Sequence, residues 1–205
     1  INIERYARIL EKEVSTAEDR YGYIDYYHAG DAAGEASQLL YHTELCFKTI
    51  ETAEIISVCF AVIKTIAPAL NNSDDSGGEI GGALEQAVEL VARTASEKDL
   101  SDTVKKELFE LCLKYHNTDG MDINSWDIDL LDVAGELVSS QQEKERLFVL
   151  LDQKDKAASW HHTNELTAQI RQKVIGHLEG SDAAASYIES MIHLPGIRKQ
   201  FVEKY

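Results

Sequence analysis

The chain has 205 residues, with 36 acidic residues against 20 Lys and Arg, and its formal net charge at pH 7 is −16. This charge disfavours nucleic acid and acidic membrane surfaces as partners, because both are bound through clustered Lys and Arg side chains. The length and an apolar fraction of 44% fit globular structure, and we expect a single all-helical domain over 1–205 with a softer boundary near 155–160.

Apolar residues recur at helical rather than strand spacing along the chain. No run with period-two alternation is bounded by turn residues, so the sequence predicts no sheet. Short turns between long helices force neighbours to lie antiparallel. We therefore predict an all-α fold, an irregular α-solenoid or helical array of stacked antiparallel helical hairpins of the tetratricopeptide or HEAT kind. The expected helices are 3–14, 32–50 (capped by Asp31), 52–70, 79–96, 101–115, 127–139, 142–155, 161–178, 182–193 and 196–204.

The segment 52–70 is the most apolar of the expected helices and has scarcely any polar face. A helix that is hydrophobic all round is buried in a core or spans a membrane. Glu54, Lys64 and Pro68 interrupt the apolar run, which favours the buried core helix.

Cysteine usage and targeting signals favour a cytoplasmic location. The chain has three cysteines, which is an odd number, and no two of them form a CxxC pair. This pattern predicts no disulfide framework. The cysteines are Cys46, Cys59 and Cys112. All three fall on or beside apolar helix stripes, and we interpret them as small buried side chains. The sequence shows no secretory-type leader and no uninterrupted apolar run of about 18 residues. The first residue, Ile1, is compatible with an excised piece of a longer protein or a processed product.

The segment 71–84 reads NNSDDSGGEIGGAL and is the most unusual in the chain. It resembles the DDS-x-G-E-hydrophobic-G motif of a helical family of unknown function whose members accompany, or belong to, bacterial proteins with SWIM-type zinc fingers. Residues 20–26 (RYGYIDY) and 189–195 (ESMIHLP) are similar to further segments of that family, so the resemblance extends over about 20–205. It implies a helical, protein-binding bacterial module and brings no catalytic residues. A SWIM finger needs Cys-x-Cys followed by Cys-x-His, which this chain lacks, so zinc and DNA binding are not carried over.

Two interpretations of the DDS segment remain open. It offers oxygen atoms of the kind that Ca²⁺ prefers, although an EF-hand register would place Ala83 where a bidentate Glu is required. The simpler interpretation, which we favour, has Asp75 or Ser76 cap the helix 79–96. The oxygen-bearing side chains are Ser73, Asp74, Asp75, Ser76 and Glu79.

Between Lys114 and Lys144 the chain has no Lys or Arg, while acidic residues accumulate over 119–136. This asymmetry predicts either a docking face for a basic partner or an ordinary solvated helix face. Tryptophan is enriched in cores and in interface hot spots, so it fits either alternative. The candidate partner-binding residues are Trp126, Asp127, Asp129 and Asp132.

Tyrosines crowd the N-terminal part of the chain. Aromatic walls with a few polar groups are typical of small-molecule pockets, and the candidate pocket residues are Arg20, Tyr23, Asp25, Tyr26 and His28. The alternative that we favour is a mixed packing and hydrogen-bonding layer in which the first helices cover the helix 52–70 and the tyrosine hydroxyls reach water.

Histidines near the end of the chain, in Trp160-His161-His162 and at His177, do not have the spacing of a metal site. We expect no metal and no cofactor, and no nucleophile motif is present. The leading hypothesis is a non-enzymatic protein-interaction or scaffold module of a bacterial cytoplasmic protein, whose partner is another protein or another domain of its parent chain. The alternative is an enzyme or small-molecule binder that uses Arg20, Asp25 and His28 for anion binding and acid–base chemistry.

Overall fold

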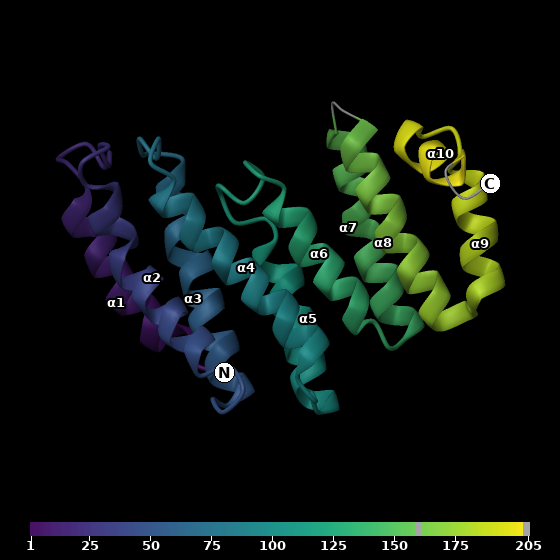
Figure 1. The fold of residues 1–205 in the computed structure, drawn as a ribbon, viewed down its shortest axis with the longest axis horizontal. Helices are drawn as coiled ribbons and strands as arrows, with labels where there is room; N and C mark the ends of the chain where they lie inside the picture. The colour runs from purple at the N-terminus through teal and green to yellow at the C-terminus, as the bar shows by residue number, and fades with distance from the viewer. Residues whose placement is uncertain (159–160, 203–205) are drawn as a thin grey trace. The chain divides into compact units, whose positions relative to one another are not determined.

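The computed structural model describes residues 1–158 and 161–202, and side chains over 1–158 and 162–199. Within these residues the protein has ten α-helices and no strand, so the predicted all-α fold is confirmed (Figure 1). The helices are α1 (Ile3–Ala17), α2 (Ala29–Leu45), α3 (Thr52–Leu70), α4 (Glu79–Glu97), α5 (Asp102–Tyr115), α6 (Trp126–Leu137), α7 (Gln141–Ala157), α8 (His161–Glu179), α9 (Ser181–Ser190) and α10 (Pro195–Val202).

Helix α2 departs most from its predicted bounds. It was expected over 32–50 with Asp31 as its cap, but it begins at Ala29 and ends at Leu45, so that Asp31 lies within its first turn. An earlier carboxylate starts the helix instead, because Asp25 accepts hydrogen bonds from the backbone N–H groups of Tyr27 and His28.

The chain forms two compact units, residues 1–130 and 131–205, and α6 begins in the first and ends in the second. Unit 1 contains 25 acidic and 11 basic residues and therefore carries −14 of the net charge of −16. A single domain over 1–205 and a solenoid arrangement stay predictions. The softer boundary expected near 155–160 lies partly outside the described residues.

Unit 1 is built around α3. This helix contacts α1, α2, α4 and α5, and α1 to α4 lie side by side in Figure 1. By length and composition alone α3 is also apolar enough to cross a membrane, yet 72% of its apolar window is buried. This burial is what the sequence predicted for a central core helix.

Unit 2 is built around α8, which contacts α7, α9 and α10. The end of α6 also packs here, since a Cβ at Gly135 would lie 3.1 Å from Cγ2 of Ile170. Helix α10 begins at Pro195, and the Glu165 carboxylate accepts a hydrogen bond of 2.6 Å from the N–H of Gly196. Glu165 therefore caps the last helix of the unit.

The interpretation of all three cysteines as buried is wrong for Cys46, which is exposed. The reason is the early end of α2 at Leu45, which leaves Cys46 at the C-cap rather than on an apolar stripe. Cys59 and Cys112 are buried as expected. Burial raises the pKa of the Cys59 thiol to about 12, so that thiol is inert at neutral pH.

Candidate functional site

The two most unusual segments of the sequence lie against each other at one end of unit 1. The N–H of Ile24 donates to the carbonyl of Asn72 at 2.9 Å, and the N–H of Asp74 donates to the carbonyl of Ile24 at 2.8 Å. These bonds form an isolated parallel bridge between Ile24 and Ser73. The side chain of Ile24 is fully buried, so it anchors the segment 18–28, called the tyrosine loop below, to the loop that precedes α4.

The first half of the tyrosine loop is closed by Asp19. Its Oδ1 accepts hydrogen bonds from the N–H groups of Tyr21, at 2.7 Å, and Tyr23, at 3.0 Å. The N–H of Asp19 donates in turn to the carbonyl of Tyr23 at 2.9 Å. An aspartate that binds the backbone two residues ahead is typical of an Asx turn, and these hydrogen bonds reverse the chain over residues 19–23.

The second half of the loop is closed by Asp25. Its Oδ1 accepts from the N–H of Tyr27 at 2.9 Å and of His28 at 3.2 Å, and it lies 2.8 Å from Nδ1 of His28. The hydrogen bond with the His28 side chain holds the pKa of the Asp25 carboxyl below its ordinary value. Asp25 and His28 thus form a local turn that starts α2.

Between these fixed points the tyrosine side chains face solvent. The exposed fractions are 77% for Tyr21, 44% for Tyr23, 50% for Tyr26 and 85% for Tyr27. The rings of Tyr26 and Tyr27 meet edge to face with centroids 5.6 Å apart. The guanidinium carbon of Arg20 lies 4.6 Å from the centroid of the Tyr21 ring.

These exposures correct the predicted packing layer. That interpretation holds for Tyr6, which is buried on α1 and donates a hydrogen bond to the Glu54 carboxylate of α3. The tyrosines of the loop do not cover α3, because Ile24 alone turns inward while its neighbours are held outward by the Asp19 and Asp25 turns.

The five predicted pocket residues, Arg20, Tyr23, Asp25, Tyr26 and His28, do lie together along the loop, on an exposed surface. None of them lines the cavity between α1 and α2 or the cavity between α1 and α3. The enzymatic alternative stays a prediction.

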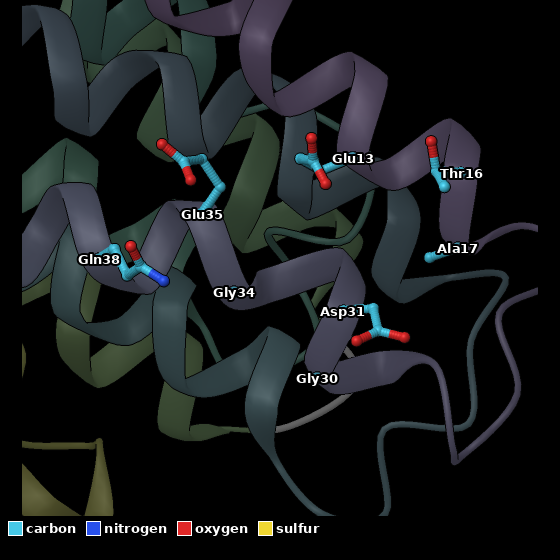
Figure 2. A pocket seen from close by; sticks show the side chains of 8 residues that line it. All are labelled: Glu13, Thr16, Ala17, Gly30, Asp31, Gly34, Glu35 and Gln38. Atoms are coloured by element: carbon cyan, nitrogen blue, oxygen red, sulfur yellow. The ribbon is translucent and has the colours of Figure 1, made fainter.

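A cavity of about 350 Å³ opens between α1 and α2, next to the point where the tyrosine loop joins them. Figure 2 shows Glu13 and Thr16 of α1 and Asp31, Glu35 and Gln38 of α2 around it. We call this cavity the acidic groove; its lining residues are Glu13, Thr16, Ala17, Gly30, Asp31, Gly34, Glu35 and Gln38.

No side chain among the described residues pairs with the groove carboxylates of Glu13, Asp31 or Glu35. The second cavity, between α1 and α3, differs in this respect. There Nζ of the lining residue Lys64 lies 2.8 Å from Glu4 and 3.7 Å from Glu11, so a cation of the protein itself already pairs with carboxylates at this cavity.

The DDS segment caps α4, as the simpler of the two interpretations predicted. Oδ1 of Asp75 accepts from the N–H of Ile80 at 2.9 Å, and Oδ2 accepts from the N–H of Gly81 at 2.8 Å. Ser76 has a different role, because its hydroxyl donates to Oδ1 of Asp74. Both Asp75 oxygens are therefore engaged with the first turn of the helix.

Replacing Asp75 with Ala is expected to lower the free energy of unfolding by about 1–2 kcal/mol, because two backbone donors of α4 lose their acceptor. Ser76→Ala should cost well under about 1 kcal/mol, because its hydroxyl does not bond to the helix. Chemical denaturation of both variants checks this. Equal losses, or a melting temperature of the wild type that rises by several degrees in millimolar Ca²⁺, would contradict the capping role.

The predicted partner-binding residues of the acidic stretch do not share one exposed face. Trp126 and Asp127 are buried, and a Cβ at Gly81 would lie 3.7 Å from the Trp126 ring. Asp129 is exposed, and in unit 2 Asp132 binds Nζ of Lys173 at 2.7 Å. A docking role for these four residues stays a prediction.

The histidine segment is described only in part. Trp160 and the side chain of His161 lie outside the described residues, while His162 and His177 are exposed. Among the described residues no three His, Cys, Asp or Glu side chains are grouped so that they could hold a metal ion.

A scan against protein-family models, a search of curated proteins and a search of solved structures gave no match. The resemblance to the helical family associated with SWIM-type proteins thus stays an expectation.

Proposed function

We propose that the chain is a non-enzymatic protein-interaction module that binds another protein, or another domain of its parent chain, through the tyrosine loop. The observation that carries this proposal is the exposure of Tyr21, Tyr23, Tyr26 and Tyr27 on a loop that the fold holds in place.

Tyrosine side chains are well suited to such a surface. Each offers a large, amphipathic contact area with only two rotatable side-chain bonds, so little conformational entropy is lost on binding. Exposed aromatic clusters mark interaction sites more often than scattered exposed residues do, and tyrosine is enriched among the residues that dominate binding energy.

The backbone of the loop supports the same proposal. A loop that must become ordered on binding loses affinity to the cost of ordering. Here Asp19, Ile24 and Asp25 each fix the backbone in the free protein through hydrogen bonds of 2.7–3.2 Å. The loop that carries the tyrosines is therefore preorganised before binding, which favours recognition of a partner.

The test starts from a partner that is crosslinked to the chain in its native host, then purified and titrated directly. The double variant Tyr21→Ala/Tyr27→Ala removes the two most exposed rings and should weaken binding at least about tenfold, since an interface hot spot is worth roughly 2 kcal/mol. The matched control is Tyr41→Ala, because Tyr41 is also exposed, at 56%, but lies in the last two turns of α2. Wild-type affinity in the double variant, or an equal loss in the control, would contradict the proposal.

A further inference from the structure

We infer that the partner contributes a segment rich in Arg or Lys, which lies across the tyrosine loop and places one basic side chain in the acidic groove. This inference rests on the proposed function and adds the chemistry of the partner. Two features of unit 1 carry it: the unpaired carboxylates of the groove, which lie in a predominantly acidic segment, and the exposed aromatic rings of the adjoining loop.

The groove supplies a concave site whose chemistry selects a cation. Glu13 projects from α1, and Asp31 and Glu35 project from α2, so carboxylates from both helices line one cavity of about 350 Å³. None of them has a partner among the described residues. An arginine or lysine side chain would pair with these groups while its aliphatic stem stays against the helices.

Charge around the groove favours the same occupant. Residues 13–35, which include the tyrosine loop and every lining residue of the groove except Gln38, contain six acidic residues and a single basic one, Arg20. A surface with one sign of charge attracts a partner segment of the opposite sign and speeds its association. The acidic residues are Glu13, Glu18, Asp19, Asp25, Asp31 and Glu35.

The tyrosine loop continues the groove. Residues 18–28 join the end of α1 to the start of α2, the two helices that line the cavity. Ala17 and Gly30 line the groove and lie next to the two ends of the loop, so a partner segment that extends past this end of the groove would reach the exposed tyrosine rings, which bind cations on their faces. Within the loop itself the guanidinium carbon of Arg20 already lies 4.6 Å from the centroid of the Tyr21 ring.

Glycines leave the groove open. A Cβ added at Gly30 or Gly34 would meet no atom within 4 Å, although both lie inside α2 with ordinary helical backbone. Nothing within the fold requires glycine at these two positions. A longer side chain at Gly34 would occupy the groove without straining the helix, which provides a way to block the site.

The first test titrates the full chain with a short acetylated and amidated peptide of alternating Arg and Ser. We expect NMR shifts of the backbone amides of Asp31, Gly34 and the tyrosine loop, and an affinity that falls as salt is raised. The matched peptide in which citrulline replaces Arg has the same shape and no charge, and it should not shift these amides.

Two pairs of variants distinguish binding in the groove from attraction by the overall negative charge of the protein. The triple variant Glu13→Gln, Asp31→Asn, Glu35→Gln should weaken the Arg peptide about tenfold, since each ion pair is worth up to about 1 kcal/mol. Its control removes the same charge at exposed positions elsewhere in unit 1, Glu85→Gln, Glu89→Gln, Glu107→Gln.

Gly34→Met should also weaken the Arg peptide about tenfold by filling the groove, which would remove the same ion pairs. Its control, Gly82→Met, is placed on an exposed and open position of α4. A peptide that shifts neither groove nor loop amides, or that responds equally to each variant and its control, would overturn the inference. The proposed function has a separate test: it is contradicted when the native partner binds the Tyr21→Ala/Tyr27→Ala variant with wild-type affinity.

Discussion

Replacing Gly120 with Ala is expected to lower the free energy of unfolding by about 2–4 kcal/mol, because a positive φ and a steric clash act at the same position. Gly120 has a φ of +88°, and a Cβ there would lie 2.1 Å from the carbonyl oxygen of Ala67 and 2.9 Å from its carbonyl carbon. Both atoms belong to the backbone of α3, the central helix of unit 1, which cannot move aside without disturbing the core.

Gly22→Ala is the matched control for this variant. Gly22 has a φ of +77°, yet a Cβ there would meet no atom within 4 Å. Gly22→Ala should therefore lower the free energy of unfolding only by the backbone contribution, about 1 kcal/mol. Urea unfolding of the two variants separates the clash from the backbone strain. Equal losses would show that the loop before α6 does not pack tightly on α3.

The helices of this protein could be predicted because local patterns determine them. Each apolar stripe repeats at the helical period, and every expected helix has a counterpart among the described residues. The start of α2 could not be placed in the same way. Asp25 and Asp31 are both good cap residues, and only the turn that Asp25 makes with Tyr27 and His28 decides between them.

The candidate site could not be predicted from local patterns, because it depends on contacts between segments that are far apart in the sequence. The bridge between Ile24 and Ser73 joins segments separated by α2 and α3. Once Ile24 is turned inward by this bridge, Tyr23 is left on the exposed side. The sequence carried one unused signal for the groove: Gly30 and Gly34, and Asp31 and Glu35, are each four residues apart and so share faces of one helix.

The acidic stretch shows the opposite limit. Its charge predicted an exposed face, but Asp127 is buried and Asp132 is paired with Lys173. Trp126 fitted either a core or an interface, and it is buried. A run of acidic residues along a helix says how much charge is present. It does not say which members face inward, because that is set by what packs against the helix.

Replacing Asp155 with Ala is expected to destabilise the protein by about 2–3 kcal/mol, because it removes a partner of a buried cation. The Arg171 side chain is only 9% exposed, and its guanidinium donates to Oδ2 of Asp155 at 2.8 Å and to Oδ1 of Asp152 at 2.7 Å. Asp155 also accepts a hydrogen bond from the hydroxyl of Thr167. Its removal would leave both Arg171 and a buried hydroxyl with one acceptor fewer.

Asp152→Ala should lower the free energy of unfolding by less than about 1 kcal/mol, because water screens an exposed ion pair. We expect this smaller loss although the hydrogen bond from Arg171 to Asp152 is as short as the one to Asp155. Asp152 is 61% exposed and Asp155 is 29% exposed, so the two variants differ mainly in the burial of the carboxylate. Chemical denaturation of both, with Asp155→Asn as a third variant that keeps an acceptor for Thr167, measures the difference. A loss in Asp152→Ala that equals the loss in Asp155→Ala would show that burial does not set the strength of this network.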